Sequence, residues 1–134
     1  MKQATTTTTS GKRKQAVARA KLVKGTGRVF INKMPLNVYG QEMQRMRILE
    51  PVILAGKTME HYDVHVKSNG GGVSGQADAI RLSVALALTQ AKPELKEIYL
   101  EYDRQLLVAD VRRKEKRKPN THGQARAKRQ KSYR

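Results

Sequence analysis

The chain lacks features that would place it in several special classes of protein. It has no cysteine, so nothing in it depends on an oxidising compartment. It has no uninterrupted apolar run long enough to span a bilayer, and its first residues, MKQATTTTTSG, contain no apolar signal region. These absences favour a soluble cytoplasmic protein, and a length of 134 residues favours one small domain with tails.

Acidic residues are almost absent from the two ends of the chain. Residues 1–41 carry nine basic residues and no carboxylate, and residues 112–134 carry eleven basic residues and only Glu115. Residues 42–111 carry eight basic and ten acidic residues, so the net charge of +17 divides into +9, −2 and +10 along the chain. The sequence therefore predicts a near-neutral body with cationic ends, which repel themselves unless a polyanion neutralises them.

The polyanion that suits the C-terminal segment best is nucleic acid. A membrane-surface helix needs an apolar face, and residues 112–134 contain no Leu, Ile, Val, Phe or Trp. Aromatic residues are few, and two of them, Phe30 and Tyr62, are predicted core residues, so base stacking is not expected to dominate. We expect Lys and Arg to bind phosphates and to recognise shape. A solvated tail or a localisation signal is the alternative interpretation of so dense a basic run.

Alternating apolar residues predict strands in the first half of the chain. Residues 16–23 and 28–31 are predicted to form a β-hairpin around the loop Gly25-Thr26-Gly27. Residues 61–67, HYDVHVK, are predicted to form a strand with one buried face. The threonine repeat near the N-terminus predicts a flexible segment over residues 1–10.

Helical spacing of apolar residues predicts a first helix over residues 41–56. Pro51 is predicted to break or restart this helix, and Gly56 is well placed to cap its end. The apolar residues at helical spacing are Met43, Met46, Leu49 and Ile53.

A second helix is predicted from an N-cap at Ser74 to Pro93, with Asp78 favouring its first turn. It is apolar on nearly all sides, so we expect it in the middle of the core. Residues 94–103 are predicted to form a short helix and residues 105–111 a closing strand. The resulting element order predicts an α+β domain of two layers, a small mixed sheet with helices on one side.

Two patterns in the sequence resemble catalytic or metal-binding motifs, but their context does not support either function. Residues 70–75 match G-x-G-x-x-G, but the preceding strand alternates and a hairpin stands where a βαβ unit should begin, so a nucleotide-dependent enzyme is disfavoured. The glycines themselves permit either a tight strand-to-helix turn or a close approach of backbone N–H groups to an RNA phosphate. His61 and His65 have no third ligand nearby. No enzyme, cofactor or metal site is predicted.

Three segments carry a resemblance to a known family. They are GKRKQAVARAKLVKGTGRVFIN, SNGGGVSGQADAIRLSVALAL and DVRRKEKRKP, and the chain ends in a basic SYR. From Gly11 to Arg134 the sequence resembles ribosomal protein nine of the small ribosomal subunit, a universal ribosomal protein. Bacterial members commonly end Ser-Lys-Arg, whereas this chain ends Ser-Tyr-Arg. That ending, with KPNTHGQARAKRQ before it, is similar to that of archaeal members, and eukaryotic cytosolic members share the last three residues.

The resemblance implies a fold like that of the second domain of ribosomal protein five, with a left-handed β-α-β crossover. It also implies a place in the head of the small subunit, bound to 16S-type rRNA and beside neighbouring head proteins. A basic tail, residues 112–134, would extend from a globular domain, residues 11–111, towards the transfer RNA (tRNA) in the P site. A free-standing protein that coats nucleic acid non-specifically is the alternative function.

The residues expected to contact RNA fall into two groups. Those expected to bind ribosomal RNA are Lys12, Arg13, Lys14, Arg28, Gly70, Gly71, Gly72, Arg112, Arg113, Lys114, Lys116, Arg117, Lys118, Arg126, Lys128 and Arg129. By the resemblance, those expected to approach the P-site tRNA are Lys131, Tyr133 and Arg134. Tyr133 stands where many members have Lys, and a phenol can hydrogen-bond or stack but cannot neutralise a phosphate.

Overall fold

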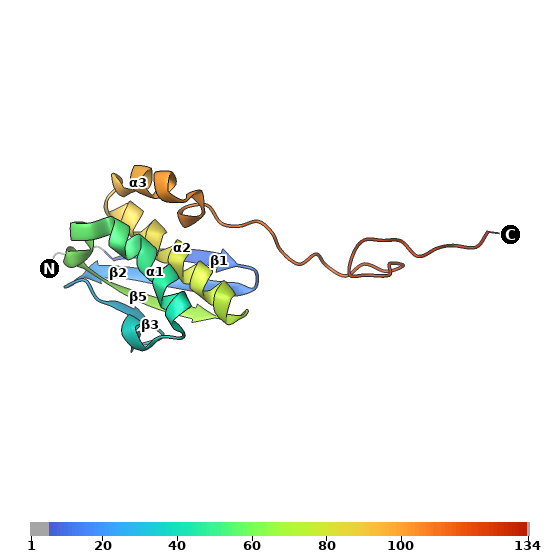
Figure 1. Ribbon diagram of the computed structural model, residues 1–134, viewed down its shortest axis with the longest axis horizontal. Coiled ribbons are helices and arrows are strands. Elements are labelled where there is room, and N and C mark those ends of the chain that lie inside the picture. Colours follow the sequence, from blue (N-terminus) through green and yellow to red (C-terminus); the bar gives the residue numbers. More distant parts are fainter. Residues whose placement is uncertain (1–5, 134) are drawn as a thin grey trace.

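A five-stranded sheet with helices on one face forms the body of the protein (Figure 1). The structure is a computed structural model that describes residues 6–133. The strands are β1 (Thr7–Arg13), β2 (Ala16–Lys24), β3 (Val29–Ile31), β4 (Met34–Pro35) and β5 (Tyr62–Asn69), in the spatial order β1-β2-β5-β3-β4. Only β3 and β5 are parallel among these neighbours. The prediction of a two-layer α+β domain with a small mixed sheet is confirmed.

Three α-helices and three short 3₁₀ helices complete the described residues. The α-helices are α1 (Glu42–Ala55), α2 (Val73–Ala91) and α3 (Leu95–Tyr102). The 3₁₀ helices are η1 (Leu36–Val38), η2 (Gly56–His61) and η3 (Arg104–Leu106). Since α1 lies between the parallel strands β3 and β5 in the chain, these elements form a β-α-β crossover. Its handedness and the kinship with ribosomal protein five stay predictions.

Hairpins in the described residues join β1 to β2 and β3 to β4, and not β2 to β3. The predicted hairpin is wrong because β5 lies between those two strands. Asp63 of β5 accepts the backbone N–H groups of Thr26 and Arg28, each at 2.9 Å, which draws the glycine loop over the end of β5. The predicted flexibility of residues 1–10 is wrong for residues 7–10, which belong to β1. Residues 1–5 lie outside the described residues.

Helix α1 continues through Pro51, so the predicted break is wrong. The proline is buried, and its carbonyl accepts the hydroxyl of Tyr99 from α3 at 2.8 Å. Burial raises the pKa of that hydroxyl, which is fully covered. These tertiary contacts offset the backbone hydrogen bond that proline cannot make. Gly56 caps the helix with φ +55°, as predicted.

Helix α2 is the centre of the core, as its apolar sequence predicts. Ile80, Val84 and Leu88 are completely buried between the sheet and the other helices. Its N-cap is Gly72 and not Ser74, so the predicted start is wrong by two residues, and Asp78 lies beyond the first turn. The predicted end before Pro93 is confirmed.

The contact between β1 and α2 is a close backbone approach at Gly11. A Cβ atom on Gly11 would lie 2.4 Å from the carbonyl oxygen of Ala79 and 2.9 Å from the nitrogen of Ser83. The neighbouring Thr9 donates its hydroxyl to the Ser83 carbonyl at 2.7 Å. The sheet and α2 can therefore meet here only because residue 11 has no side chain.

We expect Gly11→Ala to lower the free energy of unfolding by about 3 kcal/mol, since the new methyl meets backbone atoms that cannot rotate away. Chemical denaturation of the full chain measures this difference. Gly72→Ala is the control, because nothing lies within 4 Å of its Cβ position, and it should cost less than about 1 kcal/mol. Equal losses in the two variants would contradict the close approach.

The short helix predicted over residues 94–103 is confirmed as α3, but the predicted closing strand is wrong. The carboxylate of Asp103 accepts the N–H of Gln105 at 2.9 Å and starts η3 instead. Leu106 is buried and anchors this turn to the core. After it the described residues up to 133 form no helix, and the tail extends away from the body (Figure 1).

Candidate nucleic-acid interface

The N-terminus of α2 lies at the same edge of the sheet as the β1–β2 turn. Val17 of β2 pairs with Asn69 of β5, so the chain enters α2 beside that turn. Gly70 and Gly71 have φ of +74° and +63°, and a Cβ on Gly71 would lie 2.8 Å from the nitrogen of Ala16. These two glycines therefore permit a tight turn against the neighbouring strand connection.

Gly72 differs from the two glycines before it. Its backbone is extended, it is exposed, and a Cβ there would meet no atom of residues 6–133 within 4 Å. It is the N-cap of a 19-residue helix whose first N–H groups have no partner within the helix. Of the two interpretations of the glycine run, the turn accounts for Gly70 and Gly71, and the open helix N-terminus at Gly72 remains able to bind an anion.

A pocket at this edge collects cations around the helix N-terminus. The lining residues come from the β1–β2 turn, the start of α2 and the root of the tail, and they are Arg13, Lys14, Gln15, Gly71, Gly72, Arg112, Arg113 and Lys114. Among the described residues, no carboxylate lines this pocket. Backbone N–H groups and five cationic side chains that converge on one space favour phosphate as the ligand. We call this space the cationic pocket.

Asp110 holds the start of the tail, at Arg112, against the body, at Arg13. Its carboxylate accepts the side chain of Arg112 at 2.7 Å and the backbone N–H of Arg112 at 2.9 Å, and it pairs with Arg13 at 3.1 Å. The hydrogen bonds from Arg112, followed by the two positive charges, hold the pKa of Asp110 far below its usual range, so it stays ionised at neutral pH. With the tail held here, Arg113 and Lys114 line the same pocket as Gly72.

Sequence reasoning did not single out Asp110. The signal available was a carboxylate two residues before a basic run, in the spacing D-x-R, but the apolar residues around it favoured a strand. The structure also gives Arg13 a partly structural role, because its guanidinium contacts Asp110 and lies 3.8 Å from Asp78.

A neighbouring cleft is lined by ion pairs. Arg81 contacts Glu50 at 2.5 Å and Asp103 at 3.0 Å, and Arg47 contacts Asp78 at 2.7 Å. These pairs join α1, α2 and the segment after α3. Most cations of this cleft pair with carboxylates, whereas Lys14, Arg113 and Lys114 of the cationic pocket form no ion pair with a described carboxylate. The cleft is therefore a poorer phosphate site than the cationic pocket.

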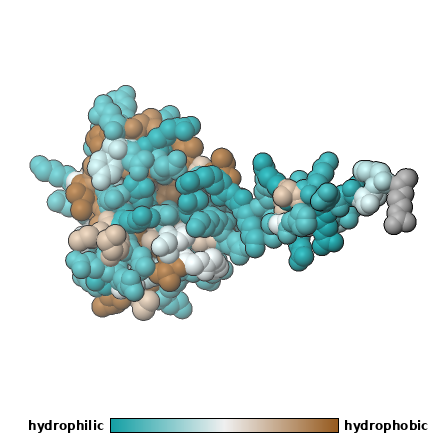
Figure 2. Space-filling model, turned by 45° about the vertical axis from the view of Figure 1, so that its right-hand side comes forward, coloured by the Kyte–Doolittle hydropathy of each residue, from teal (hydrophilic) through white to brown (hydrophobic). Residues whose placement is uncertain are grey.

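The tail beyond the pocket is exposed and hydrophilic over most of its length (Figure 2). Arg126 pairs with Glu115, the one acidic residue of the tail, which lowers the pKa of that carboxyl. Between Glu115 and Arg126 the tail folds into a loop. Backbone hydrogen bonds close this loop, such as the one from the N–H of His122 to the carbonyl of Ala127 at 2.9 Å. The tail cations that form no ion pair with a carboxylate of the described residues are Arg113, Lys114, Lys116, Arg117, Lys118, Lys128, Arg129 and Lys131.

The remaining expected site residues lie elsewhere. Lys12 is exposed on β1, and Arg28 lies far along the sheet from the pocket, paired with Asp63 at 3.2 Å. Tyr133 is exposed near the end of the tail, and Arg134 lies outside the described residues. The structure thus brings Arg13, Lys14, Gly71, Gly72 and residues 112–114 together around the pocket, with Gly70 in the adjoining turn, and leaves the other expected residues outside it.

Aromatic and histidine residues differ from expectation. Phe30 is not a core residue, because the buried positions of β3 are its neighbours Val29 and Ile31. Its ring stacks on His65 with centroids 5.1 Å apart. His61 belongs to η2 and not to the strand. Within residues 6–133 no group of three or more potential ligand side chains could hold a metal ion, and no helix is long and apolar enough to cross a membrane.

Comparison of the sequence with known proteins identifies a family. A sequence model described as ribosomal protein S9/S16 matches residues 11–134, which include both the cationic pocket and the tail. The chain belongs to the ribosomal protein S9 family. The resemblance inferred from the three sequence segments is confirmed.

Archaeal members of the S9 family are similar over nearly their whole length. Small ribosomal subunit protein uS9 of Methanothrix thermoacetophila is 50% identical over 127 residues, which cover 93% of this chain and 96% of the relative. The uS9 proteins of Methanococcus maripaludis strain C7 and of Methanococcus vannielii are each 46% identical over 129 residues, covering 94% of this chain and 96% of each relative. The archaeal character inferred from the ending and from the KPNTHGQARAKRQ segment before it is confirmed.

Proposed function

We propose that this S9-family protein is a structural constituent of the small ribosomal subunit in the cytoplasm. It binds 16S-type rRNA in the head of the subunit, beside neighbouring head proteins, and acts without catalysis or a cofactor. The relatives are named as small ribosomal subunit proteins, which supports the assembly. The observation that carries the RNA binding is the cationic pocket, where an open helix N-terminus and five cations surround one space.

In this function the chain divides into a globular body, residues 11–111, which follows an N-terminal segment, residues 1–10, and a basic tail, residues 112–134. The body folds through its own core, whose last buried residue is Leu106. The tail has no apolar residue in that core, so it becomes ordered on RNA, where counterion release offsets the loss of conformational entropy. Its unpaired cations bind rRNA phosphates, and Lys131, Tyr133 and Arg134 approach the anticodon stem of the P-site tRNA.

Reversal of two charges tests the pocket. Arg113→Glu/Lys114→Glu should weaken binding of the full chain to 16S-type rRNA by at least about 100-fold at 0.1 M salt, because two cations beside the helix N-terminus become anions. Filter binding over a series of salt concentrations measures the change.

Lys96→Glu/Arg104→Glu is the matched control, since both residues are exposed, form no ion pair with a described carboxylate, and lie on α3 and η3. It makes the same change in net charge and should weaken binding by less than about tenfold. If the two double variants lost equal affinity, the pocket would be an ordinary charged surface, and only non-specific coating of nucleic acid would remain.

A further inference from the structure

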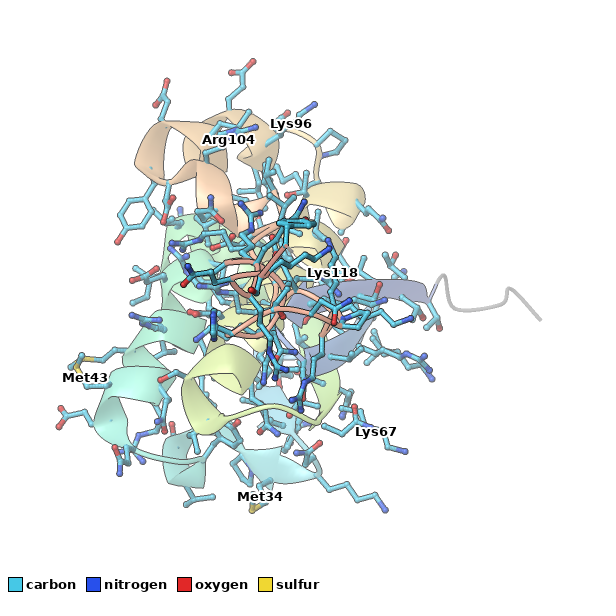
Figure 3. The ribbon with its side chains drawn as sticks, turned by 90° about the vertical axis from the view of Figure 1, so that its right-hand side faces the viewer. Met34, Met43, Lys67, Lys96, Arg104 and Lys118 are labelled. Atoms are coloured by element: carbon cyan, nitrogen blue, oxygen red, sulfur yellow. The ribbon has the colours of Figure 1, made fainter. Side chains whose placement is uncertain are left out.

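The face of the sheet that carries no helix is a separate basic surface. Lys67 on this face and Met43 on α1 point to opposite sides of the molecule (Figure 3). The register of the strands sets Arg19 of β2 beside Lys67 of β5, and Lys21 of β2 beside His65 of β5. Neighbouring strands are about 4.8 Å apart, so these side chains form two adjacent cross-strand pairs. We call the helix-free surface of the sheet around these two pairs the open face.

The cations of the open face are unpaired within the described residues. Arg19, Lys21 and Lys67 are exposed, and none of them forms an ion pair with a described carboxylate. The strands carry a single carboxylate, Asp63, which is buried beneath the loop after β2 and binds Arg28. The hydrogen bonds from the N–H groups of Arg28 and Thr26 lower the pKa of Asp63, so this carboxylate stays ionised. Its negative charge is balanced by the Arg28 guanidinium that it binds. The surface around Arg19 therefore attracts anions.

Two aromatic rings lie on the same face. Phe30 and His65 stack with an interplanar angle of 8°, and the guanidinium carbon of Arg28 lies 5.5 Å from the Phe30 centroid. A groove along the rings is also lined by Arg19, Lys21 and Lys67. Flat rings beside a row of cations are the combination that binds an unstacked base together with its phosphates.

The open face is continuous with the cationic pocket around the edge of the sheet. Lys12 is exposed and pairs with Val17, which pairs in turn with Asn69 just before the glycine turn. From Val17 to Lys21 is four residues of strand, about 13 Å. One strand of RNA that leaves the pocket can therefore pass Lys12 and reach the aromatic pair.

We propose that the open face is a second RNA-binding surface, which holds a single-stranded segment of rRNA. Arg19, Lys21 and Lys67 bind its phosphates, and the Phe30–His65 stack receives one unpaired base. The inference rests on the proposed function, since it assigns a further surface to the same RNA. A protein neighbour fits this face less well, because the cores of protein interfaces are depleted in charged residues.

The test compares charge and ring variants of the full chain in binding to purified 16S-type rRNA. Arg19→Gln/Lys21→Gln/Lys67→Gln should reduce the slope of log K against log salt by about 2 to 3, since about one unit is lost for each phosphate contact. Lys57→Gln/Lys96→Gln/Arg104→Gln removes the same charge from exposed positions that form no ion pair with a described carboxylate, and it should change the slope by less than about 1. Phe30→Leu should weaken binding about tenfold without changing the slope, because it removes a stacking ring and no charge.

His65→Gln provides a second ring variant at an exposed position, should Phe30→Leu unfold the protein, and it should weaken binding by a similar factor. The outcomes separate two failures. If the wild-type chain does not bind the RNA above non-specific levels, the proposed function fails. If the wild type binds and Arg113→Glu/Lys114→Glu weakens it, but the open-face variants match their control, only this inference fails and the face is left for a protein neighbour.

Discussion

A chain that ends at Val111 is expected to lose stable incorporation into small subunits. The deletion removes eleven basic residues and one acidic residue, including three cations of the cationic pocket. If at least five of these cations bind phosphates, the slope of log K against log salt for rRNA falls by about 4 or more. Affinity at 0.1 M salt should then fall by at least about 100-fold. Filter binding gives the slope, and sedimentation of reconstituted subunits through high-salt sucrose gives the incorporation.

The truncated chain should still fold, which makes the binding result interpretable. Its core is complete at Leu106, and Asp110 retains its contact with Arg13. We expect its melting temperature to lie within about 5 °C of that of the full chain. Truncated protein that sedimented with subunits as fully as the wild type in high salt would show that the body alone supplies the affinity.

Deletion of residues 128–134 is expected to spare incorporation and to weaken P-site tRNA binding about tenfold. The segment holds four basic residues, and it is exposed over residues 128–133. The cations of residues 112–118 would still bind rRNA, so assembly should continue. Losing two or more phosphate contacts near the tRNA is enough for a tenfold effect at moderate salt. Binding of tRNA to isolated subunits programmed with messenger RNA measures the difference.

A chain in which residues 128–134 are replaced by a Ser/Gly segment of equal length distinguishes the effect of the side chains from the effect of the length of the tail. It should bind tRNA as weakly as the deletion, because it restores length without charge. Tyr133→Phe removes only a hydroxyl and should reveal whether the phenol hydrogen-bonds or merely stacks. Subunits with the deletion that bound tRNA as tightly as wild type would leave the end of the tail without a role in the P site.

Local patterns in the sequence were sufficient for most elements but not for their pairing. The apolar run from Ala79 to Leu88 identified the central helix, and alternation identified β2 and β5. The hairpin was assigned wrongly because the strand that separates β2 from β3, β5, lies more than 30 residues along the chain from β3, where Asp63 binds the loop between β2 and β3. Pro51 was read as a break because its buried partner, Tyr99, is 48 residues away.

The candidate site was predictable in its charge and less so in its geometry. Charge counting identified Arg13, Lys14 and residues 112–114, but no pattern along the chain indicated that they meet at Gly72. That meeting depends on the β1–β2 turn and on the anchor at Asp110, both of which are tertiary features. Phe30 was assigned to the core because Val29, Phe30 and Ile31 are all apolar, so the strand showed no alternation to reveal its exposed face.

The most direct test of the account is a reconstruction of the assembled small subunit at a resolution that shows phosphates and side chains. We predict an rRNA phosphate within hydrogen-bond distance of the N–H groups that follow Gly72, with Arg113 and Lys114 beside it and the tail continuous into RNA density. A subunit in which the start of α2 faces solvent or protein, with the basic tail folded back over the body and away from RNA, would contradict it.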